Sequence, residues 1–214
     1  SDMIQEKVNK SNLQVLYQTQ MAVEESLKLV QNYYTLFAYS KEVANLIDGN
    51  LDYKDIESIL QIQETLKGIM KTHTVVKNAY LVNFVQGWFI SNESAGTINN
   101  IVNKNQIYEL IDTSKKNICW TYVTRDENKN YLSNYIDVED ITMIIRLPFN
   151  ENRPKAGIIV NLSQYQFNKL FNSRGKEERL LIIDENNRVL YDDSHSNIGR
   201  KFGDYSFSNV IMDS

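Results

Sequence analysis

Apolar residues in the first 47 positions recur at the spacing of one long amphipathic helix. The stripe consists of Leu16, Val23, Leu27, Val30, Tyr34 and Phe37. Steps of three, four and seven residues place these side chains on one helical face. The chain has no proline or glycine before Gly49, where Asp48-Gly49-Asn50 is a helix stop signal. The pattern predicts a helix over about residues 3–47, roughly 65 Å long, and two shorter helices with an unmarked break are the alternative.

A second amphipathic helix follows the stop signal. Asp52 or Asp55 is its expected N-cap, and the helix is expected to end between Gly68 and Thr72. Its apolar side consists of Ile56, Ile59, Ile62, Leu66 and Ile69. Beyond this helix the hydrophobic period changes from that of a helix to that of strands.

The rest of the chain has the pattern of a sheet with short helical inserts. Strands are predicted at residues 76–85, 88–91, 118–124, 141–147 and 156–162, with a polar loop at 94–100 and short helices at 106–114 and 164–171. Antiparallel neighbours joined by short turns indicate an α+β domain, with the long helix on one face of a five-stranded sheet. After a candidate linker at 172–178, residues 180–183 and 188–191 begin another hairpin around the turn 185–187.

Composition is that of an ordinary globular protein, with 42% hydrophobic and 23% charged residues. The net charge of -4 and the lack of a basic patch exclude a nucleic-acid surface. The single cysteine, Cys119, rules out an internal disulfide, and its place in a strand predicts a small core residue. No apolar run approaches the ~20 residues that span a bilayer, as is also expected of a domain taken from between two membrane helices.

Residues suited to catalysis are few. His73 at a helix end and His195 in a loop have no metal-ligand spacing between them. Ser194-His195 beside Asp192 and Asp193 has the residue types of a catalytic triad, but sequence neighbours do not generally adopt triad geometry. We therefore assign these four residues to a surface loop. No catalytic residue, metal or cofactor is predicted, and the segment is not expected to be an enzyme.

Binding of a small molecule fits the composition better, because thirteen tyrosines and two tryptophans supply flat surfaces with polar tips. In the strand 141–147, Thr142, Ile144 and Arg146 share one face. An arginine in an apolar strand must face a partner, a pocket or solvent, and Asn161 poses the same question. The candidate ligand-binding residues are Tyr80, Trp88, Trp120, Tyr122, Arg125, Arg146 and Asn161. Core packing is the alternative for the aromatic residues, and an edge or salt-bridge position is the alternative for Arg146.

Two passages carry a resemblance to a known family. VKNAYLVNFVQGWFISN and LLIIDENNRVLYDDSHSNIGRKF both resemble the first hairpin of a PAS-like sensing module. The second is similar to the extracellular Cache pattern of apolar strand, Asp, turn, Val-Leu, polar loop and Ile-Gly-Lys/Arg. The implied fold is α+β: a long N-terminal helix packed on a five-stranded antiparallel PAS-like (Cache) sheet, followed by the start of a second, similar module. The implied domains are the helices at 1–74, a membrane-distal module at 75–172 and an incomplete membrane-proximal module at 178–214.

The resemblance implies an extracellular small-molecule sensor of a bacterial receptor that is membrane-anchored in its full-length form. The long helix would relay binding to a cytoplasmic output, which is a histidine kinase, an AraC-type regulator or a chemotaxis receptor. A homodimer through this helix is expected, with the stripe that includes Leu27 and Val30 as the contact. The alternative is a structural, dimerising ectodomain that binds nothing.

One departure from the family bears on the ligand. Amino-acid-binding Cache domains carry an arginine, a spacer and an adjacent Trp-Tyr pair on the helical side of the pocket. This chain has no such motif, and its nearest combination, Trp120, Tyr122 and Arg125, lies on a predicted strand. The ligand is therefore an unknown small molecule, and amino-acid sensing is not supported.

Overall fold

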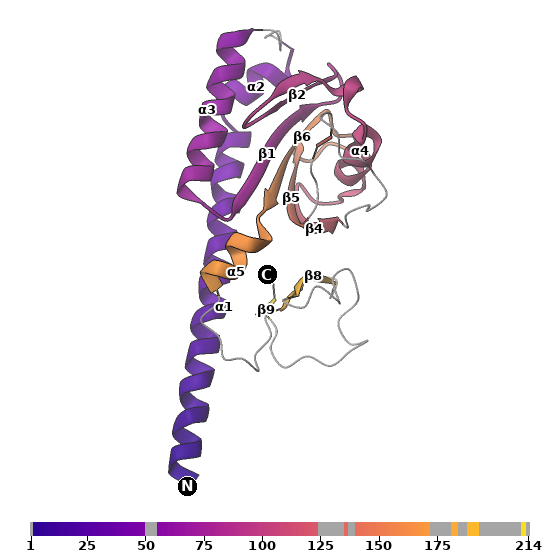
Figure 1. Ribbon diagram of the computed structural model, residues 1–214. Helices are drawn as coiled ribbons and strands as arrows, with labels where there is room; N and C mark the ends of the chain where they lie inside the picture. Colours follow the sequence, from indigo (N-terminus) through magenta and orange to yellow (C-terminus); the bar gives the residue numbers. More distant parts are fainter. Residues whose placement is uncertain are drawn as a thin grey trace. The chain divides into compact units, whose positions relative to one another are not determined.

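The computed structural model (Figure 1) describes residues 2–49, 55–123, 135–136, 140–171, 181–183, 188–192 and 211–212. The chain forms two compact units. The larger unit is Val30–Ser163, and the smaller one combines Ser1–Leu29 with Gln164–Ser214. None of the described helices is long and apolar enough to cross a membrane.

The predicted long helix is divided near its end into α1, Asp2–Ala38, and α2, Lys41–Ile47. The break comes at Ser40, which has extended backbone angles and accepts a hydrogen bond from the Val43 N–H as an N-cap. The alternative of two helices is therefore the correct one, although α1 is still about 55 Å long. Gly49, with φ of +80°, follows α2 as the stop signal predicted.

The helix α3, Ile56–Thr72, agrees with the second predicted helix. Asp55 is its N-cap and accepts a hydrogen bond from the Glu57 N–H at 3.2 Å. The stripe predicted on α1 is buried at every position whose side chain is described: Val23, Leu27, Val30, Tyr34 and Phe37. Leu16 lies outside the described side chains.

An antiparallel sheet of six strands, in the order β3-β2-β1-β6-β5-β4, forms the centre of the larger unit. The strands are β1 Val76–Asn83, β2 Trp88–Ser91, β3 Ala95–Thr97, β4 Ile118–Val123, β5 Asp140–Leu147 and β6 Ala156–Leu162. The five predicted strands are confirmed. β3 lies in the segment predicted as loop, because Ala-Gly-Thr is too short and too small to show alternation, and it pairs with β2 as an edge strand. The 3-10 helix η1, Ile98–Asn100, and the helix α4, Lys104–Thr113, follow it.

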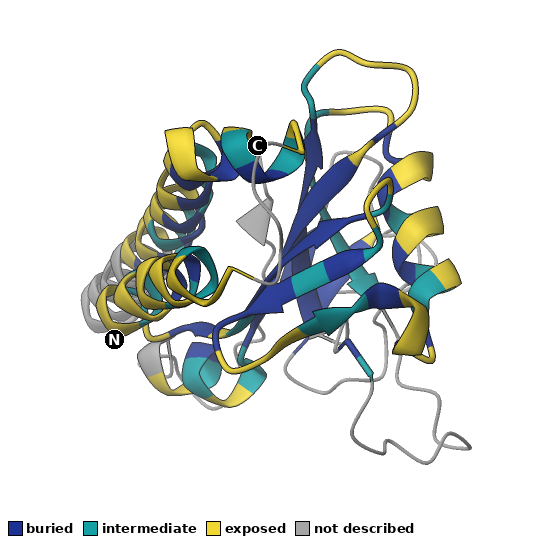
Figure 2. Ribbon diagram, turned by 90° about the horizontal axis from the view of Figure 1, so that it is seen from above, coloured by how far each residue is buried: buried dark blue, intermediate teal, exposed yellow. Residues whose placement is uncertain are grey.

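Helices cover both faces of this sheet, and the buried strands lie between them (Figure 2). We call the two sides the α1 face and the α4 face. On the α4 face Tyr80, Val82, Ile144 and Ile159 pack with Ile98, Ile101, Ile107, Ile111 and Ile136. α4 lies so close to β6 that a Cβ atom on Gly157 would meet Ile111 Cδ1 at 2.5 Å. The α4 face therefore has an apolar core of its own.

The smaller unit contains α5, Gln164–Phe171, and a sheet in the order β8-β7-β9. Its strands are β7 Leu181–Ile183, β8 Val189–Asp192 and β9 Ile211–Met212, of which β9 is parallel to β7. The predicted hairpin is confirmed as the antiparallel pair β7 and β8. The Phe167 and Tyr191 rings lie 5.0 Å apart between α5 and β8.

One residue of the second hairpin is not where the sequence predicted it. Asp192 is fully buried and pairs with Leu181 at the end of β8, so its assignment to a surface loop is wrong. Backbone pairing with β7 extends the strand by one residue past the point where side-chain polarity suggests that it ends. Asp193, Ser194 and His195, the turn 185–187 and the linker 172–178 lie outside the described residues.

Candidate ligand-binding site

The residues predicted to bind a ligand are divided between the two faces of the sheet. On the α1 face, Trp88 is fully buried and donates from Nε1 to Gln86 Oε1 at 2.7 Å. Trp120 donates from Nε1 to Gln31 Oε1 of α1 at 3.1 Å, and Tyr122 shares its face. Tyr80, Arg146 and Asn161 lie on the α4 face, while Arg125 is outside the described residues. The sheet thus separates the candidates instead of gathering them in one site.

Arg146 is 7% exposed and is held by backbone carbonyls. Nη1 donates to the carbonyls of Asp112 at 3.3 Å and Ser114 at 2.5 Å. Nη2 donates to the carbonyls of Glu151 at 3.2 Å and Asn152 at 2.7 Å. A cation at the C-terminal end of α4 is favoured by the helix dipole. Arg146 therefore connects α4 to the β5–β6 loop, residues 148–155, and its predicted need for a partner is met by main chain.

Polar side chains cross the α4 face in one line. The register places Thr121 of β4 opposite Thr142 of β5, Thr142 opposite Asn161 of β6, and Asn161 opposite Asn78 of β1. Directly opposed residues share a face, so these four residues form what we call the polar row. Thr142 and Asn161 are fully buried, and Asn161 Nδ2 donates to Thr142 Oγ1 at 2.9 Å.

The polar row has the chemistry of a site for a small polar molecule. Amides and hydroxyls both donate and accept hydrogen bonds, and burying such groups is costly unless they are hydrogen-bonded. The row ends at half-buried Thr121 on one side and half-buried Asn78 on the other. Of these four residues the sequence predicted only Asn161 to bind a ligand, because their alignment depends on strand register and no single strand shows it.

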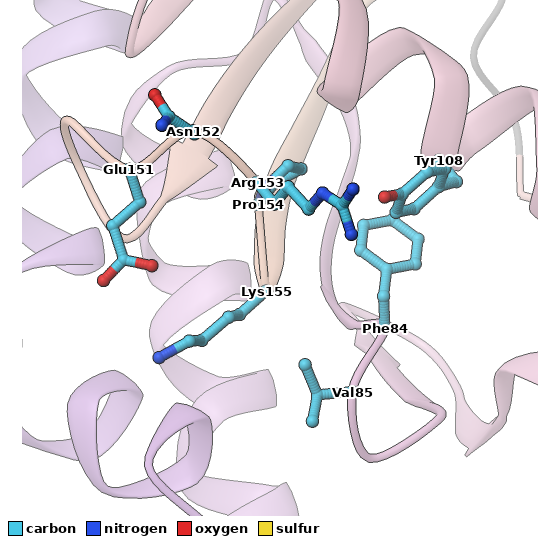
Figure 3. A pocket seen from close by; sticks show the side chains of 8 residues that line it. All are labelled: Phe84, Val85, Tyr108, Glu151, Asn152, Arg153, Pro154 and Lys155. Carbon is cyan, nitrogen blue, oxygen red and sulfur yellow. The ribbon is translucent and has the colours of Figure 1, made fainter.

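An open pocket of about 590 Å³ lies beside the β5–β6 loop (Figure 3). Its volume is within the range of small-molecule sites. The pocket is lined by Phe84, Val85, Tyr108, Glu151, Asn152, Arg153, Pro154 and Lys155. None of these residues was singled out from the sequence. The run Glu-Asn-Arg-Pro-Lys is a visible concentration of charge, but nothing in it shows that Phe84 and Tyr108 lie next to it.

Two aromatic rings and two cations line this pocket. The Phe84 and Tyr108 rings meet edge to face with centroids 5.1 Å apart. The Arg153 side chain extends toward both rings, whereas the Lys155 side chain extends to the other side (Figure 3). Pro154 between them is buried, so the loop presents both cations outward.

The β5–β6 loop is fixed by hydrogen bonds along its length. Asn150, with φ of +63°, donates from its N–H to Asn117 Oδ1 at 2.9 Å. Asn117 Nδ2 donates in return to Asn150 Oδ1 at 3.0 Å. The Lys155 N–H donates to the Leu147 carbonyl at 2.9 Å and closes the loop. With the two carbonyls held by Arg146, the pocket wall has a defined backbone.

The comparison with protein-family models found no family that matches the chain. The uncharacterized HTH-type transcriptional regulator YtdP of Bacillus subtilis (strain 168) is 20% identical over 211 residues. The match covers 96% of the chain, and the chain spans 27% of the length of that relative.

Solved structures resemble the chain over most of its length. The sensory domain of the Campylobacter jejuni chemoreceptor Tlp3 with isoleucine bound has a TM-score of 0.55 at 16% identity, covering 89% of this chain and 73% of that one. The ligand-binding domain of the Pseudomonas aeruginosa PAO1 chemoreceptor PctC, in complex with GABA, has 0.54 at 10% identity, covering 99% and 86%. The extracellular domain of soHK1S-Z6 has 0.57 at 11% identity, covering 88% and 72%. The chain has a Cache-type fold.

In this Cache-type fold the two faces of the sheet have different surroundings. The α1 face buries Trp88 and contacts α1 through Trp120, while the α4 face holds the polar row. Cys119 is half-buried against the apolar core of the α4 face, as predicted for a small core residue. Among the described residues no group of three or more His, Cys, Asp or Glu side chains is placed to hold a metal ion.

Proposed function

We propose that the chain is the extracellular small-molecule sensing domain of a bacterial signal-transduction receptor that is membrane-anchored in its full-length form. The observation that carries this proposal is the polar row on the sheet face opposite α1. A ligand held by Asn161 and Thr142, with Tyr80 beside them on the same face, contacts strands whose other face contacts the helix. The Cache-type fold, shared with receptor sensory domains, supports the same function.

The proposed mechanism is a shift between two arrangements of the sheet against α1. A ligand shifts this equilibrium only to the extent that it binds one arrangement more tightly. Changing a ratio of 1:99 to 99:1 takes an affinity difference of about 10⁴-fold. The hydrogen bond between Trp120 and Gln31, at 3.1 Å, joins β4 to α1 and is one contact through which strand displacement reaches the helix.

A transcription regulator is the output that we propose in the full-length protein. The support is the match over 96% of the chain to a part of an HTH-type transcriptional regulator. The alternative outputs are a histidine kinase and a chemotaxis receptor, because sensory domains of such receptors share the fold. We propose 75–172 as the membrane-distal ligand module, because it contains the whole six-stranded sheet, and 178–214 as the beginning of a membrane-proximal module.

A second candidate function, dimerisation of the ectodomain, is favoured by apolar side chains on the outside of α1. Leu29, Tyr33 and Leu36 are 40%, 42% and 70% exposed, at steps of four and three along the helix, and the Tyr33 ring also contacts His73 on one side. This outer stripe replaces the one predicted from the sequence, since Leu27 and Val30 are 4% and 0% exposed and belong to the core of the chain itself. We propose that a second copy of the chain binds the outer stripe.

Thermal unfolding of the purified chain against a panel of amino acids, organic acids, sugars and nucleosides tests the sensing function. At least one compound is expected to raise Tm, because a ligand at 100 times its Kd stabilises the native state by about 2.7 kcal/mol. Asn161→Leu and Thr142→Val should abolish the ligand-induced shift, whereas Thr65→Val on the exposed side of α3 should keep it. If no compound shifts Tm, or if both variants keep the full shift, the sensing proposal is wrong.

A further inference from the structure

We infer that the pocket beside the β5–β6 loop is a separate binding site for a small organic carboxylate with a flat apolar body. Binding at this pocket does not depend on the sensing function or on the polar row. The charge of the pocket, the shape of its apolar wall and the hydrogen-bonded backbone of the loop all favour such a ligand.

The charge of the pocket favours an anion. Arg153 and Lys155 are both exposed on its wall, in a chain whose net charge is -4. Glu151 is the one carboxylate among the lining residues, and its side chain extends away from Arg153 (Figure 3). The space beside the Arg153 guanidinium is therefore cationic. A guanidinium presents a planar fork of donors that matches the two oxygens of a carboxylate.

The apolar wall of the pocket favours a ligand whose body is a flat apolar ring. Phe84 and Tyr108 meet edge to face at 90°, both line the pocket, and Tyr108 is 36% exposed. Val85 next to them is 72% exposed and adds apolar surface to the same wall. A flat ring attached to the carboxylate would bury this surface. An inorganic anion would gain from the cations but would leave the rings exposed.

Hydrogen bonds from both sides hold the backbone of the β5–β6 loop. Asn117 and Asn150 exchange two hydrogen bonds, and Arg146 holds the carbonyls of Glu151 and Asn152. Ordering a loop upon binding costs affinity, and a preformed loop avoids that cost. Arg146 also binds the carbonyls of Asp112 and Ser114 at the end of α4, the helix that carries Tyr108. One buried side chain thus fixes both walls of the pocket.

Three probe molecules separate the contribution of the negative charge to binding from that of the aromatic ring. Benzoate has the charge and the ring, benzamide has the ring without the charge, and acetate has the charge without the ring. NMR follows the titration of the full chain with each probe up to ~10 mM, because small exposed sites bind weakly. Benzoate should bind at least about tenfold more tightly than benzamide or acetate. Added salt should weaken benzoate binding, since the cations are exposed.

Variants assign the binding to this pocket. Arg153→Gln is expected to weaken benzoate about tenfold and to remove the preference for benzoate over benzamide. Tyr108→Ala should weaken benzoate and benzamide together. Lys67→Gln, on the exposed surface of α3, is the matched loss of a positive charge and should leave benzoate binding unchanged. The inference is overturned if wild type binds no benzoate, if benzamide binds equally well, or if Arg153→Gln behaves like Lys67→Gln.

Discussion

The buried Tyr34 hydroxyl shows how a single group affects stability. Tyr34 is 0% exposed, and its hydroxyl has no hydrogen-bond partner among the described residues. Burial raises the pKa of this hydroxyl well above its ordinary value. An unpaired buried polar group costs free energy, so Tyr34→Phe should leave the free energy of unfolding unchanged or raise it by about 1 kcal/mol. Denaturation by urea measures this difference.

The control for Tyr34→Phe is a variant that removes the aromatic ring together with the hydroxyl. Tyr34→Ala leaves a cavity and should cost about 3–5 kcal/mol, because the ring belongs to the buried stripe of α1. A loss of more than about 1 kcal/mol in Tyr34→Phe would mean that the hydroxyl is hydrogen-bonded in solution.

His73 gives a prediction for the effect of pH. Burial lowers the pKa of the imidazole below its ordinary value of 6.5, and its ring lies 4.6 Å from that of Tyr33. The unfolded chain therefore takes up a proton at a higher pH than the folded chain. Stability from neutral His73 is fully present above pH 6.5 and is lost as pH falls through the lowered pKa.

The difference between wild type and His73→Gln isolates this effect, since His195 is present in both proteins. Wild type should lose more of its stability than the variant when pH is lowered from ~7.5 to ~5. Urea denaturation at both pH values provides the measurement. Equal losses in the two proteins would show that the pKa of His73 is the same in the folded and unfolded states.

Residue type alone predicted part of the site. The sequence required Arg146 to have a partner, because an unpaired buried charge is too costly. It did not indicate which partner, since the four carbonyls of Asp112, Ser114, Glu151 and Asn152 belong to the main chain. Every residue has a carbonyl, so these contacts leave no mark in the sequence.

At the scale of elements, the packing of α4 on β6 depends on one glycine. A Cβ atom at Gly157 would lie 2.5 Å from Ile111 Cδ1 and 3.2 Å from the Ile145 carbonyl oxygen. Gly157→Ala should therefore destabilise the chain by about 1–3 kcal/mol through overpacking. Thermal unfolding gives the difference directly.

Gly68 supplies the matched control in α3, where a Cβ atom would meet nothing within 4 Å. Gly68→Ala should stabilise by about 0.5–1 kcal/mol, because alanine loses less entropy than glycine in a helix. The same substitution is thus expected to have opposite signs at the two positions. A neutral or stabilising Gly157→Ala would contradict the close approach of α4 to the sheet.

Helices and strands that show a hydrophobic period were predicted. A helix break and an edge strand that depend on individual hydrogen bonds were missed. The buried stripe from Val23 to Phe37 has helical periodicity, so this part of the long helix was predicted correctly. The break at Ser40 depends on a side-chain hydrogen bond to the Val43 N–H, and serine also occurs inside helices. β3 exists because an edge of β2 is available to pair with, so it could not be found from Ala95–Thr97 alone.

At the scale of the whole molecule, the sequence predicted the fold but not the division of roles between the faces. Trp88, Trp120 and Asn161 were equal candidates for ligand binding. Strand register places the two tryptophans on the α1 face and Asn161 on the α4 face. Register arises from pairing between distant segments, so only the assembled sheet separates the residues that contact the helix from those of the polar row.

The proposed dimerisation rests on the outer stripe of α1, which is exposed, and not on the buried stripe of the same helix. Leu36 is 70% exposed, so Leu36→Asp should leave the fold intact and convert a dimer into a monomer by placing charges at the contact. Leu60→Asp, on α3 and 53% exposed, is the matched control and should remain dimeric. Leu27→Asp buries an unpaired charge in the core and should unfold the chain, so it reports nothing about assembly. Size-exclusion chromatography with light scattering gives the mass of each. A monomeric wild type, or a dimer that survives Leu36→Asp, would refute dimerisation through this stripe.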